Sequence, residues 1–396
     1  MASLIDQIGA VTALNVRSIP QRGWMSVASV VAVALTITVL LFFLALASGL
    51  QRTVEGSGVD DVAFVIRDGS NAELNSVVTR DQLAILATGP NVVQREGAPV
   101  VSGELLVIVD GVKRSTGTNA NMPFRGIGAE GLALRRSVSI TQGRMFTPGT
   151  NEIVVGAGLL REFTGFEFGE TIRLRGGTWQ IVGVFEAPGT VFESELWADI
   201  AVTQSLFDRP NVYQTMRMQL TSPAAMEAFV AWAEADPRLD GLEILSERAY
   251  YARQASQSTQ GFTAIAWALG IMMAIGALAG ALNTMYSSVA ARSAEIATLR
   301  ILGFSGVAAF FGTMVEALAL SALGGALGIL IAFVAFNGRT TSTLGSGFTQ
   351  LVFKFELSPA IIVSAIVVAI IIGLVGGLFP GIRAARTRPQ LELAAQ

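Results

Sequence analysis

The chain has 396 residues, of which 52% are hydrophobic and only 14% are charged, and its formal net charge is −3. Because soluble domains usually carry about 25% charged residues, this composition indicates that part of the chain faces lipid and part faces water. The weakly acidic balance argues against nucleic-acid binding, which requires a concentrated basic surface.

The absence of two residue types excludes several chemistries. The chain has no histidine and no cysteine, so it has no disulfides, no histidine–cysteine zinc site and no Ser–His–Asp triad. Its two lysines, Lys113 and Lys354, follow Val112 and Phe353, so neither completes the Gly-Lys-Ser/Thr end of a phosphate-binding loop. We therefore predict a non-catalytic chain without a metal or cofactor of its own, in which a partner chain would bind any ATP and magnesium.

The N-terminal region combines a helical pattern with a long apolar run. Residues 1–22 carry apolar side chains at Leu4, Ile8 and Val11, the spacing of one helical face. This pattern predicts a cytoplasmic amphipathic helix, either lying on the membrane surface or packed on another subunit. Residues 23–51 contain no charge and are longer than the apolar region of a signal peptide, so we predict an uncleaved membrane-spanning helix.

Residues 52–255 are rich in charges and are long enough to bury a core of their own. Residues 171–186 have the pattern of a β-hairpin that turns at Gly176-Gly177. Further strands are expected at 61–67, 103–111, 151–155 and 212–220. Helices are expected at 79–88, 157–164 and 223–235. This segment is therefore predicted to be an α+β domain.

Three further apolar stretches exceed the roughly 20 residues that a helix needs to cross the hydrocarbon core of a membrane. They are 256–290, 306–337 and 359–382. Each must be helical in lipid, because an unpaired backbone amide there is costly. The predicted fold is a membrane α-helical protein with four transmembrane helices and an inserted α+β extracytoplasmic domain.

The arginines near the ends of the spans predict the orientation of the chain. With four spans, both termini lie on one side together with the short loop 291–305 and the tail 383–396. This side carries most of the arginines that flank the spans. We therefore predict cytoplasmic termini, with residues 52–255 and the short loop 338–358 on the opposite side of the membrane.

One carboxylate and several glycine pairs lie inside the predicted spans. A carboxylate at the centre of a membrane helix costs on the order of 2.5–3.5 kcal/mol to insert. We expect Glu316 to bond across helices, to be neutralised by a proton or to face a polar cavity, and a proton-carrying role is the functional alternative. Small-xxx-small pairs, which let helices approach closely, are Gly276 and Gly280, Gly324 and Gly328, and Gly373 and Gly377.

The loop 291–305 has the pattern of a short helix between two spans. Arg292 and Glu295 are three residues apart and can pair. Gly303 can end the helix in the left-handed conformation, and Ser305 can cap the next helix. The apolar residues expected along one side are Ile296, Leu299 and Leu302. Such a helix would serve to dock a partner, and a plain polar turn is the alternative on the residues alone.

Several stretches resemble the MacB/FtsX-like permeases of ABC transporters, in their stand-alone DevC-like or lipoprotein-releasing-like branch. RSAEIATLRILGFS is similar to the family's coupling-helix motif, VEALALSALGGALGILIAF to its third span, and NEIVVGAGLLREF to its periplasmic core domain. In this resemblance, docking of the ATPase subunit falls to Arg292, Glu295, Ile296, Leu299, Arg300, Gly303 and Phe304. LFPGIRAARTRPQLEL matches the family's C-terminal motif through Pro380, Arg383, Arg386 and Pro389.

The resemblance implies a permease subunit in the bacterial inner membrane. It would transmit ATP hydrolysis by a separate ATPase subunit to the extracytoplasmic domain, and so export or extract a lipid, lipoprotein, peptide or drug. It implies a second permease copy or a paralogue as a partner, membrane lipid around the spans and, for export, a periplasmic membrane-fusion adaptor. The alternative is a non-transporting, FtsX-like regulator of an extracytoplasmic enzyme.

Two other classes stay open on the residues alone. A membrane-anchored binding or sensory protein would have the same spans without an ATPase partner. A membrane enzyme would need acid–base groups such as Glu193 and Glu195, although a pair of carboxylates is more often part of a solvated loop.

Overall fold

The computed structural model describes residues 3–18, 23–344 and 350–387. The chain forms two compact units. The helical unit comprises Met1–Ser48, Gly261–Gly338 and Glu356–Gln396. The sheet unit comprises Gly49–Gln260 and Arg339–Phe355.

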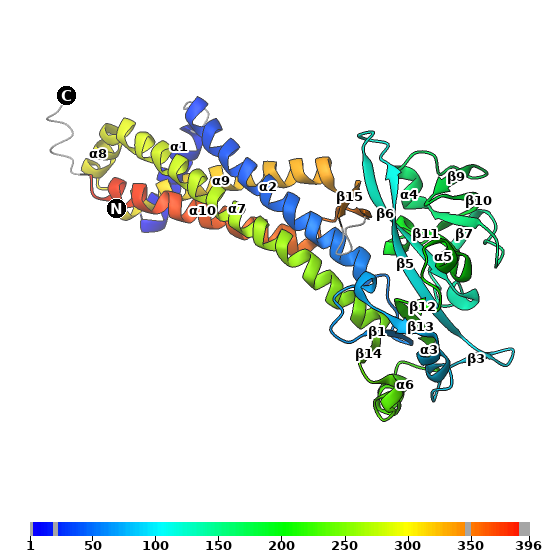
Figure 1. Cartoon of the computed structure of the whole chain (residues 1–396). Coiled ribbons are helices and arrows are strands. Elements are labelled where there is room, and N and C mark those ends of the chain that lie inside the picture. The colour runs from blue at the N-terminus through cyan, green and yellow to red at the C-terminus, as the bar shows by residue number, and fades with distance from the viewer. Residues whose placement is uncertain (1–2, 19–22, 345–349, 388–396) are drawn as a thin grey trace. The chain divides into compact units, whose positions relative to one another are not determined.

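The helical unit is built from four long and two shorter described helices, labelled in Figure 1. They are α1 (Leu4–Ser18), α2 (Gly23–Glu55), α7 (Glu247–Ala291), α8 (Ser293–Ile301), α9 (Gly306–Phe336) and α10 (Pro359–Ala385). Of the described helices, α2, α7, α9 and α10 are long and apolar enough to cross a membrane. The last residues of α2 and the first residues of α7 belong to the sheet unit, so α7 begins nine residues before the predicted span 256–290.

Two of the three small-xxx-small pairs bring helices of this chain together. Gly324 and Gly328 of α9 lie against α2, and Gly373 and Gly377 of α10 lie against α9. A Cβ added at any of these four positions would lie less than 3.0 Å from an atom of the neighbouring helix. The lack of a side chain is therefore what lets these helices approach one another.

The third pair, Gly276 and Gly280 in α7, is open. A Cβ added at either glycine would meet nothing within 4 Å. Only 17% of the most apolar stretch of α7 is buried within the chain, compared with 50% for α2. This face of α7 is left for lipid or for another protein.

Helix α1 packs on α9 of the same chain. Val11 and Asn15 are buried, and both lie close to Gly312 of α9. The Ser305 backbone N–H donates to Gln7 Oε1 at 2.9 Å, which ties α1 to the first turn of α9. Of the apolar side predicted from the sequence, Val11 therefore contacts a helix of its own chain, whereas Leu4 is exposed.

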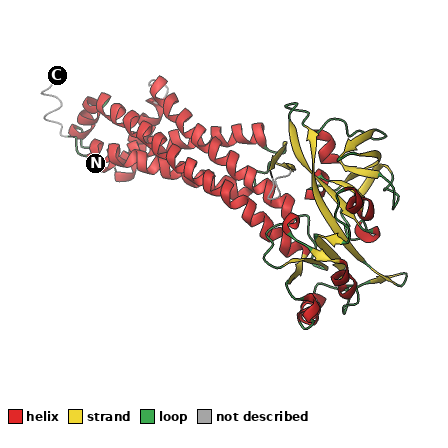
Figure 2. Cartoon of the chain, in the orientation of Figure 1, coloured by secondary structure: helices red, strands yellow, loops and turns green. Residues whose placement is uncertain are grey.

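The sheet unit is built on a ten-stranded sheet, with strands yellow in Figure 2. The strand order is β14-β1-β13-β5-β6-β11-β8-β10-β7, and β9 pairs with β10. β10 pairs with β8 and β11 with β6 in parallel, whereas the other pairs in this sheet are antiparallel. The strands are β1 (Val62–Arg67), β5 (Val101–Val112), β6 (Asn119–Ile127), β7 (Ser139–Gly143), β8 (Glu152–Gly156), β9 (Thr171–Leu174), β10 (Gly177–Glu186), β11 (Leu196–Asp199), β13 (Thr215–Gln219) and β14 (Leu242–Ser246).

The apolar cores of the described sheet unit include two that are covered by helices. Helices α3 and α6 pack around Met216 and Phe229, and helices α4 and α5 pack around Phe124 and Trp179. These helices are α3 (Arg80–Leu86), α4 (Ala157–Glu162), α5 (Ile200–Leu206) and α6 (Ala225–Glu234). Short 3-10 helices are η2 (Glu73–Asn75), η3 (Ala129–Gly131), η4 (Val191–Ser194) and η5 (Pro237–Leu239).

The chain between α9 and α10 contains a β-hairpin that belongs to the sheet unit. Its strands are β15 (Thr340–Leu344) and β16 (Gln350–Lys354). Lys113 Nζ donates to Ser342 Oγ at 3.1 Å, and Ser342 Oγ donates to Glu162 Oε2 at 3.0 Å. The Val352 backbone N–H donates to Ser194 Oγ at 2.9 Å. What was predicted as a short loop is thus fixed to the sheet unit by polar contacts.

Two further ribbons pair short strands of the sheet unit. They join β2 (Val78–Thr79) to β12 (Val212–Tyr213), and β3 (Gln94–Arg95) to β4 (Ala98–Pro99). The predicted strand 212–220 is divided at Gln214, between β12 and β13. The side chain of Gln214 accepts a hydrogen bond from the Leu106 backbone N–H at 2.6 Å, which a local pattern does not reveal.

The predicted hairpin at 171–186 is present as β9 and β10, but its turn lies one residue earlier than expected. Arg175 and Gly176 have φ values of 50° and 80°, the left-handed pair of a two-residue hairpin turn. Gly177 is already paired with Leu174 in the sheet.

Replacing Gly328 with alanine tests the close approach of α9 to α2. The added Cβ would lie 2.6 Å from the Ala34 carbonyl oxygen, so we expect a loss of about 1–3 kcal/mol of stability. Gly261→Ala in α7 is the matched control, because nothing lies within 4 Å of an added Cβ there and alanine favours a helix. The measurement is the thermal unfolding of the full chain in detergent, and equal unfolding temperatures for the two variants would contradict the packing.

Candidate functional site

The short helix between two of the long helices is the first candidate site. α8 starts after Arg292, which is its N-cap residue. Gly303 has a φ of 92°, a left-handed conformation that ends the segment. Ser305 then caps α9 by accepting a hydrogen bond from the Ala308 backbone N–H at 3.2 Å. The capping chemistry expected from the sequence is present at both residues.

The inner side of α8 is fixed to the other helices of the helical unit. Ile296 is 9% exposed and forms a small apolar cluster with Val289, Ala309 and Ala384, which belong to α7, α9 and α10. Arg300 Nη1 donates to the carbonyl oxygen of Ala385, the last residue of α10, at 3.0 Å. A cation at a helix C-terminus is favourable because it neutralises the negative end of the helix dipole.

Arg292 connects α8 to a buried carboxylate. Its Nε donates to Glu295 Oε2 at 3.0 Å, and its Nη1 lies 3.7 Å from Glu316 Oε2. Ser288 Oγ of α7 donates to Glu316 Oε1 at 3.4 Å. The carboxylate of Glu316 therefore faces polar groups of neighbouring helices, one of the arrangements expected from the sequence.

The outer side of α8 and the turn after it are exposed. Ile301 and Leu302 are 60% and 71% exposed, and Glu295, Thr298 and Gly303 are exposed as well. The sequence predicted Ile296, Leu299 and Leu302 along one apolar side, but Ile296 is buried and Leu302 is exposed, so these residues are divided between two faces. Of the predicted docking residues, Arg292, Leu299, Arg300 and Phe304 are half-buried.

The predicted C-terminal motif lies at the end of α10. Pro380 is buried within the helix, and the Arg383 guanidinium lies 5.8 Å from the centre of the Tyr286 ring of α7. Arg386 is the C-cap residue of α10. Pro389 lies outside the described residues.

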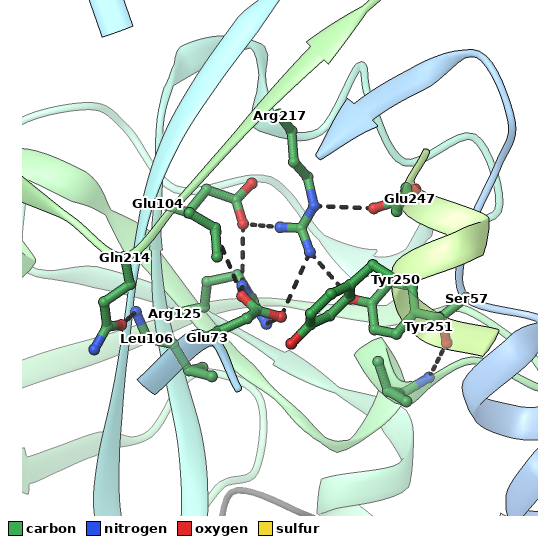
Figure 3. A network of polar contacts seen from close by, with 12 residues as sticks. Ser57, Glu73, Glu104, Leu106, Arg125, Gln214, Arg217, Glu247, Tyr250 and Tyr251 are labelled. Carbon is green, nitrogen blue, oxygen red and sulfur yellow. Dashed lines mark hydrogen bonds and ion pairs between the residues drawn. The ribbon is translucent and has the colours of Figure 1, made fainter. Parts of the chain in front are cut away.

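A buried ionic network in the sheet unit is the second candidate site, and Figure 3 shows most of its members. The network consists of Arg125, Arg135, Arg217, Glu73, Glu104, Glu195 and Glu247, all buried. Glu104 Oε2 accepts from Arg125 Nη1 at 3.1 Å, from Arg135 Nη2 at 2.6 Å and from Arg217 Nη1. Arg125 Nη2 also donates to Glu195 Oε1 at 2.7 Å. Charges taken out of water are tolerated here because each one is paired.

The guanidiniums of this network favour the ionised form of two of its carboxylates, whereas burial raises the pKa of Glu247. Burial by itself raises the pKa of Glu104, but the guanidiniums of Arg135, Arg217 and Arg125 outweigh it and lower that pKa to about 2. Glu73 follows the same pattern: burial opposes ionisation, yet Arg125 and Arg217 hold its pKa below the usual range. Both carboxylates are therefore charged at neutral pH.

The network connects the sheet to the first turn of α7. Arg217 of β13 donates through Nε to Glu247 Oε1 at 2.9 Å, and through Nη2 to the Tyr251 hydroxyl at 3.0 Å, as Figure 3 shows. The residues after α2 join the same region, because Ser57 Oγ accepts from the Val191 backbone N–H at 2.8 Å. The start of α7 is thus bonded to a strand, and the segment just after α2 is bonded to η4.

The carboxylates considered for an enzymatic role are engaged in ion pairs. Glu193 pairs with Arg161 at 3.0 Å, and Glu195 pairs with Arg125. Within residues 3–18, 23–344 and 350–387, no group of three or more metal-ligating side chains is placed to hold a metal ion.

Two family models together match most of the chain. The MacB-like periplasmic core domain matches residues 26–236, and the FtsX-like permease C-terminal domain matches residues 267–389. No curated protein matches the chain.

Two solved structures are similar to part of the chain. One is the extracellular domain of the noncanonic ABC-type transporter YknZ from Gram-positive bacteria, with 14% identity, 47% of this chain and 100% of that chain covered, and a TM-score of 0.35. The other is the periplasmic region of MacB from Actinobacillus actinomycetemcomitans, with 11% identity, 50% and 94% coverage, and a TM-score of 0.37.

The two family models support a permease-type role in an ABC transporter, and the four apolar helices with an inserted sheet unit are consistent with it. The model for the core domain alone covers more than half of the chain. The chain belongs to the MacB/FtsX-like family of ABC transporter permeases.

Replacing Glu104 with glutamine tests the buried network. In the folded chain this carboxyl has a pKa of about 2, below the roughly 4.3 of an unfolded chain. Its ionised form therefore contributes stability, about 3 kcal/mol, above the unfolded pKa, and this contribution is lost as the pH falls through the folded pKa. We expect E104Q to unfold at a lower urea concentration than the wild type at pH 7. The difference between the two unfolding midpoints should narrow towards pH 3.

Urea unfolding of the full chain in detergent, followed by tryptophan fluorescence, measures this gap. Asp236→Asn is the control, because Asp236 pairs with Arg238 at the surface and such pairs contribute little. A gap for E104Q that does not change with pH, or that is no larger than that of D236N, would contradict the network.

Proposed function

We propose that this chain is the membrane-spanning permease subunit of an ABC transporter that passes ATP hydrolysis by a separate ATPase subunit to the sheet unit. The observation that carries this proposal is that α8 has one side attached to its own chain and one side exposed. Its inner side is bonded to α7, α9 and α10 through Ile296, Arg292 and Arg300. Its outer side exposes the apolar residues Ile301 and Leu302.

The exposed tip of the α8 segment supports docking of another protein. Ile301 and Leu302 are apolar and exposed beside Gly303, and such residues are costly to leave in water unless a partner covers them. Glu295 and Thr298 are exposed polar residues of the same helix. An apolar centre with a polar rim is typical of a protein interface, and we propose that the ATPase subunit covers it.

The continuity of α7 supports transmission towards the sheet unit. α7 is one helix from Glu247 to Ala291, and Arg292 follows it directly. A displacement of α8 would therefore act on a helix whose first residue is bonded to Arg217 of β13. With cytoplasmic termini and the sheet unit outside, the movement would cross the membrane without a pore and would push or release a substrate already on the far side.

The open face of α7 supports a second copy of this chain as a partner. Gly276 and Gly280 would admit another helix closely, and Asn283 on the same helix is exposed within a stretch apolar enough to cross a membrane. An exposed amide is unfavourable against lipid. Because an amide both donates and accepts, two copies of Asn283 could bond to each other across a twofold axis.

Acidic residues at the α8 tip test the docking proposal. We expect the double variant Ile301→Asp, Leu302→Asp to lose the ATP hydrolysis that co-purifies with the wild-type chain from native membranes, because buried unpaired carboxylates oppose docking. Photolabelling with an azido-ATP identifies the subunit that hydrolyses ATP. Val77→Asp, at an exposed apolar position of the sheet unit, is the control, and equal ATPase recovery in both variants would refute docking at α8.

A cysteine at Ala279 tests the second-copy proposal. The chain has no native cysteine, and Ala279 is exposed on α7 between Gly276 and Gly280. We expect Ala279→Cys to form disulfide-linked dimers in oxidised native membranes. Val334→Cys on the exposed side of α9 is the control, and cross-linking of both variants to the same extent would show collision rather than an interface.

A further inference from the structure

Glu316 is a charged side chain in an apolar helix, and it is only 2% exposed. A carboxylate in such surroundings stays ionised only when a partner compensates for the lost hydration. Arg292 lies 3.7 Å away and supplies a guanidinium, while Ser288 donates a hydrogen bond to the other oxygen at 3.4 Å. The two interactions come from different segments of the chain, one at the end of α7 and one at the start of α8.

A small cavity lined by both polar and apolar side chains adjoins this ion pair. Its volume is about 20 Å³, enough for a single water molecule. Asn15 of α1, Ser288 of α7 and Thr313 of α9 line it together with Arg292 and Glu316. Polar groups from α1, α7, α9 and the start of α8 therefore line one cavity beside this carboxylate, and a second cation, Arg300, lines the same cavity.

We propose that Glu316 is a positioning residue whose ion pair with Arg292 holds the start of α8 against α9. The proposal rests on the function given above, because it concerns how the docking segment is mounted. Ile296 supplies the apolar part of this attachment, and the ion pair fixes the orientation of the start of α8 relative to α9. A displacement of α8 is then passed to α9 instead of being absorbed in the turn between α7 and α8.

A spin label on α8 tests this attachment without an ATPase subunit. Because the chain has no cysteine, a label at Thr298→Cys, an exposed position, reports on α8 alone. For the full chain in lipid nanodiscs, we expect E316Q to raise the ratio of mobile to immobile label about fivefold, which corresponds to about 1 kcal/mol. R292Q breaks the same pair from the other side and should give the same increase.

Charge exchange separates this role from a general loss of structure and from proton transfer. The double variant R292E, E316R restores the pair and should return the label to its original ratio, which neither a merely destabilised helix nor a lost proton carrier would do. E295Q is the matched control, because Glu295 is the exposed second partner of Arg292. We expect it to leave the mobility of the label unchanged.

An unchanged ratio in E316Q, or an increase that the exchange does not reverse, would overturn the proposal. Either result would leave docking at Ile301 and Leu302 untouched, since docking is read from the recovery of ATPase activity. Conversely, full recovery of ATPase activity with the double variant Ile301→Asp, Leu302→Asp would contradict the proposed function, whatever the mobility of the label on α8.

Discussion

A largely buried ion pair attaches each end of α7 to a neighbouring element. Glu247 begins the helix and pairs with Arg217 of β13 at 2.9 Å, and Arg292 follows its last residue and pairs with Glu316 of α9 at 3.7 Å. A buried charge that loses its partner costs on the order of 3–5 kcal/mol, so both ends resist detachment. Between them run 45 helical residues without a proline, about 68 Å at 1.5 Å per residue. A stiff element held at both ends is what the proposed transmission of movement requires.

In the sheet unit, several segments that lead into long helices meet near η4. The Val191 backbone N–H bonds Ser57 just after α2, and Ser194 Oγ accepts from Val352 in the hairpin between α9 and α10. Glu195, the next residue, enters the buried network through Arg125. The residues at 191–195 therefore connect the segment after α2, the α9–α10 hairpin and, through the network, the start of α7. A movement of any one of these segments would therefore act on residues 191–195.

The sequence predicted the long helices well because the cost of unpaired backbone groups in lipid leaves few alternatives to an apolar helix. It missed β6, where Pro123 and Arg125 are unusual for a central strand. At Pro123, β6 pairs with β5 but not with β11. Arg125 donates a hydrogen bond to Glu195, 70 residues further along the chain. The position of α8 was predicted, but its faces were not: Ile296 is buried against three other helices, whereas Leu302 is exposed. Contacts of this kind depend on packing between distant segments, which local periodicity does not contain.

We propose that ATP bound by another subunit moves the sheet unit. The most direct test of this proposal is the distance between spin labels at Val112→Cys, an exposed position of the sheet unit, in two copies of the chain within the transporter. The account predicts that the distance distribution shifts between the nucleotide-free and the ATP-bound complex, and that Arg217→Met abolishes the shift while hydrolysis continues. A distribution that stays the same in both nucleotide states, in a complex that hydrolyses ATP, would contradict it.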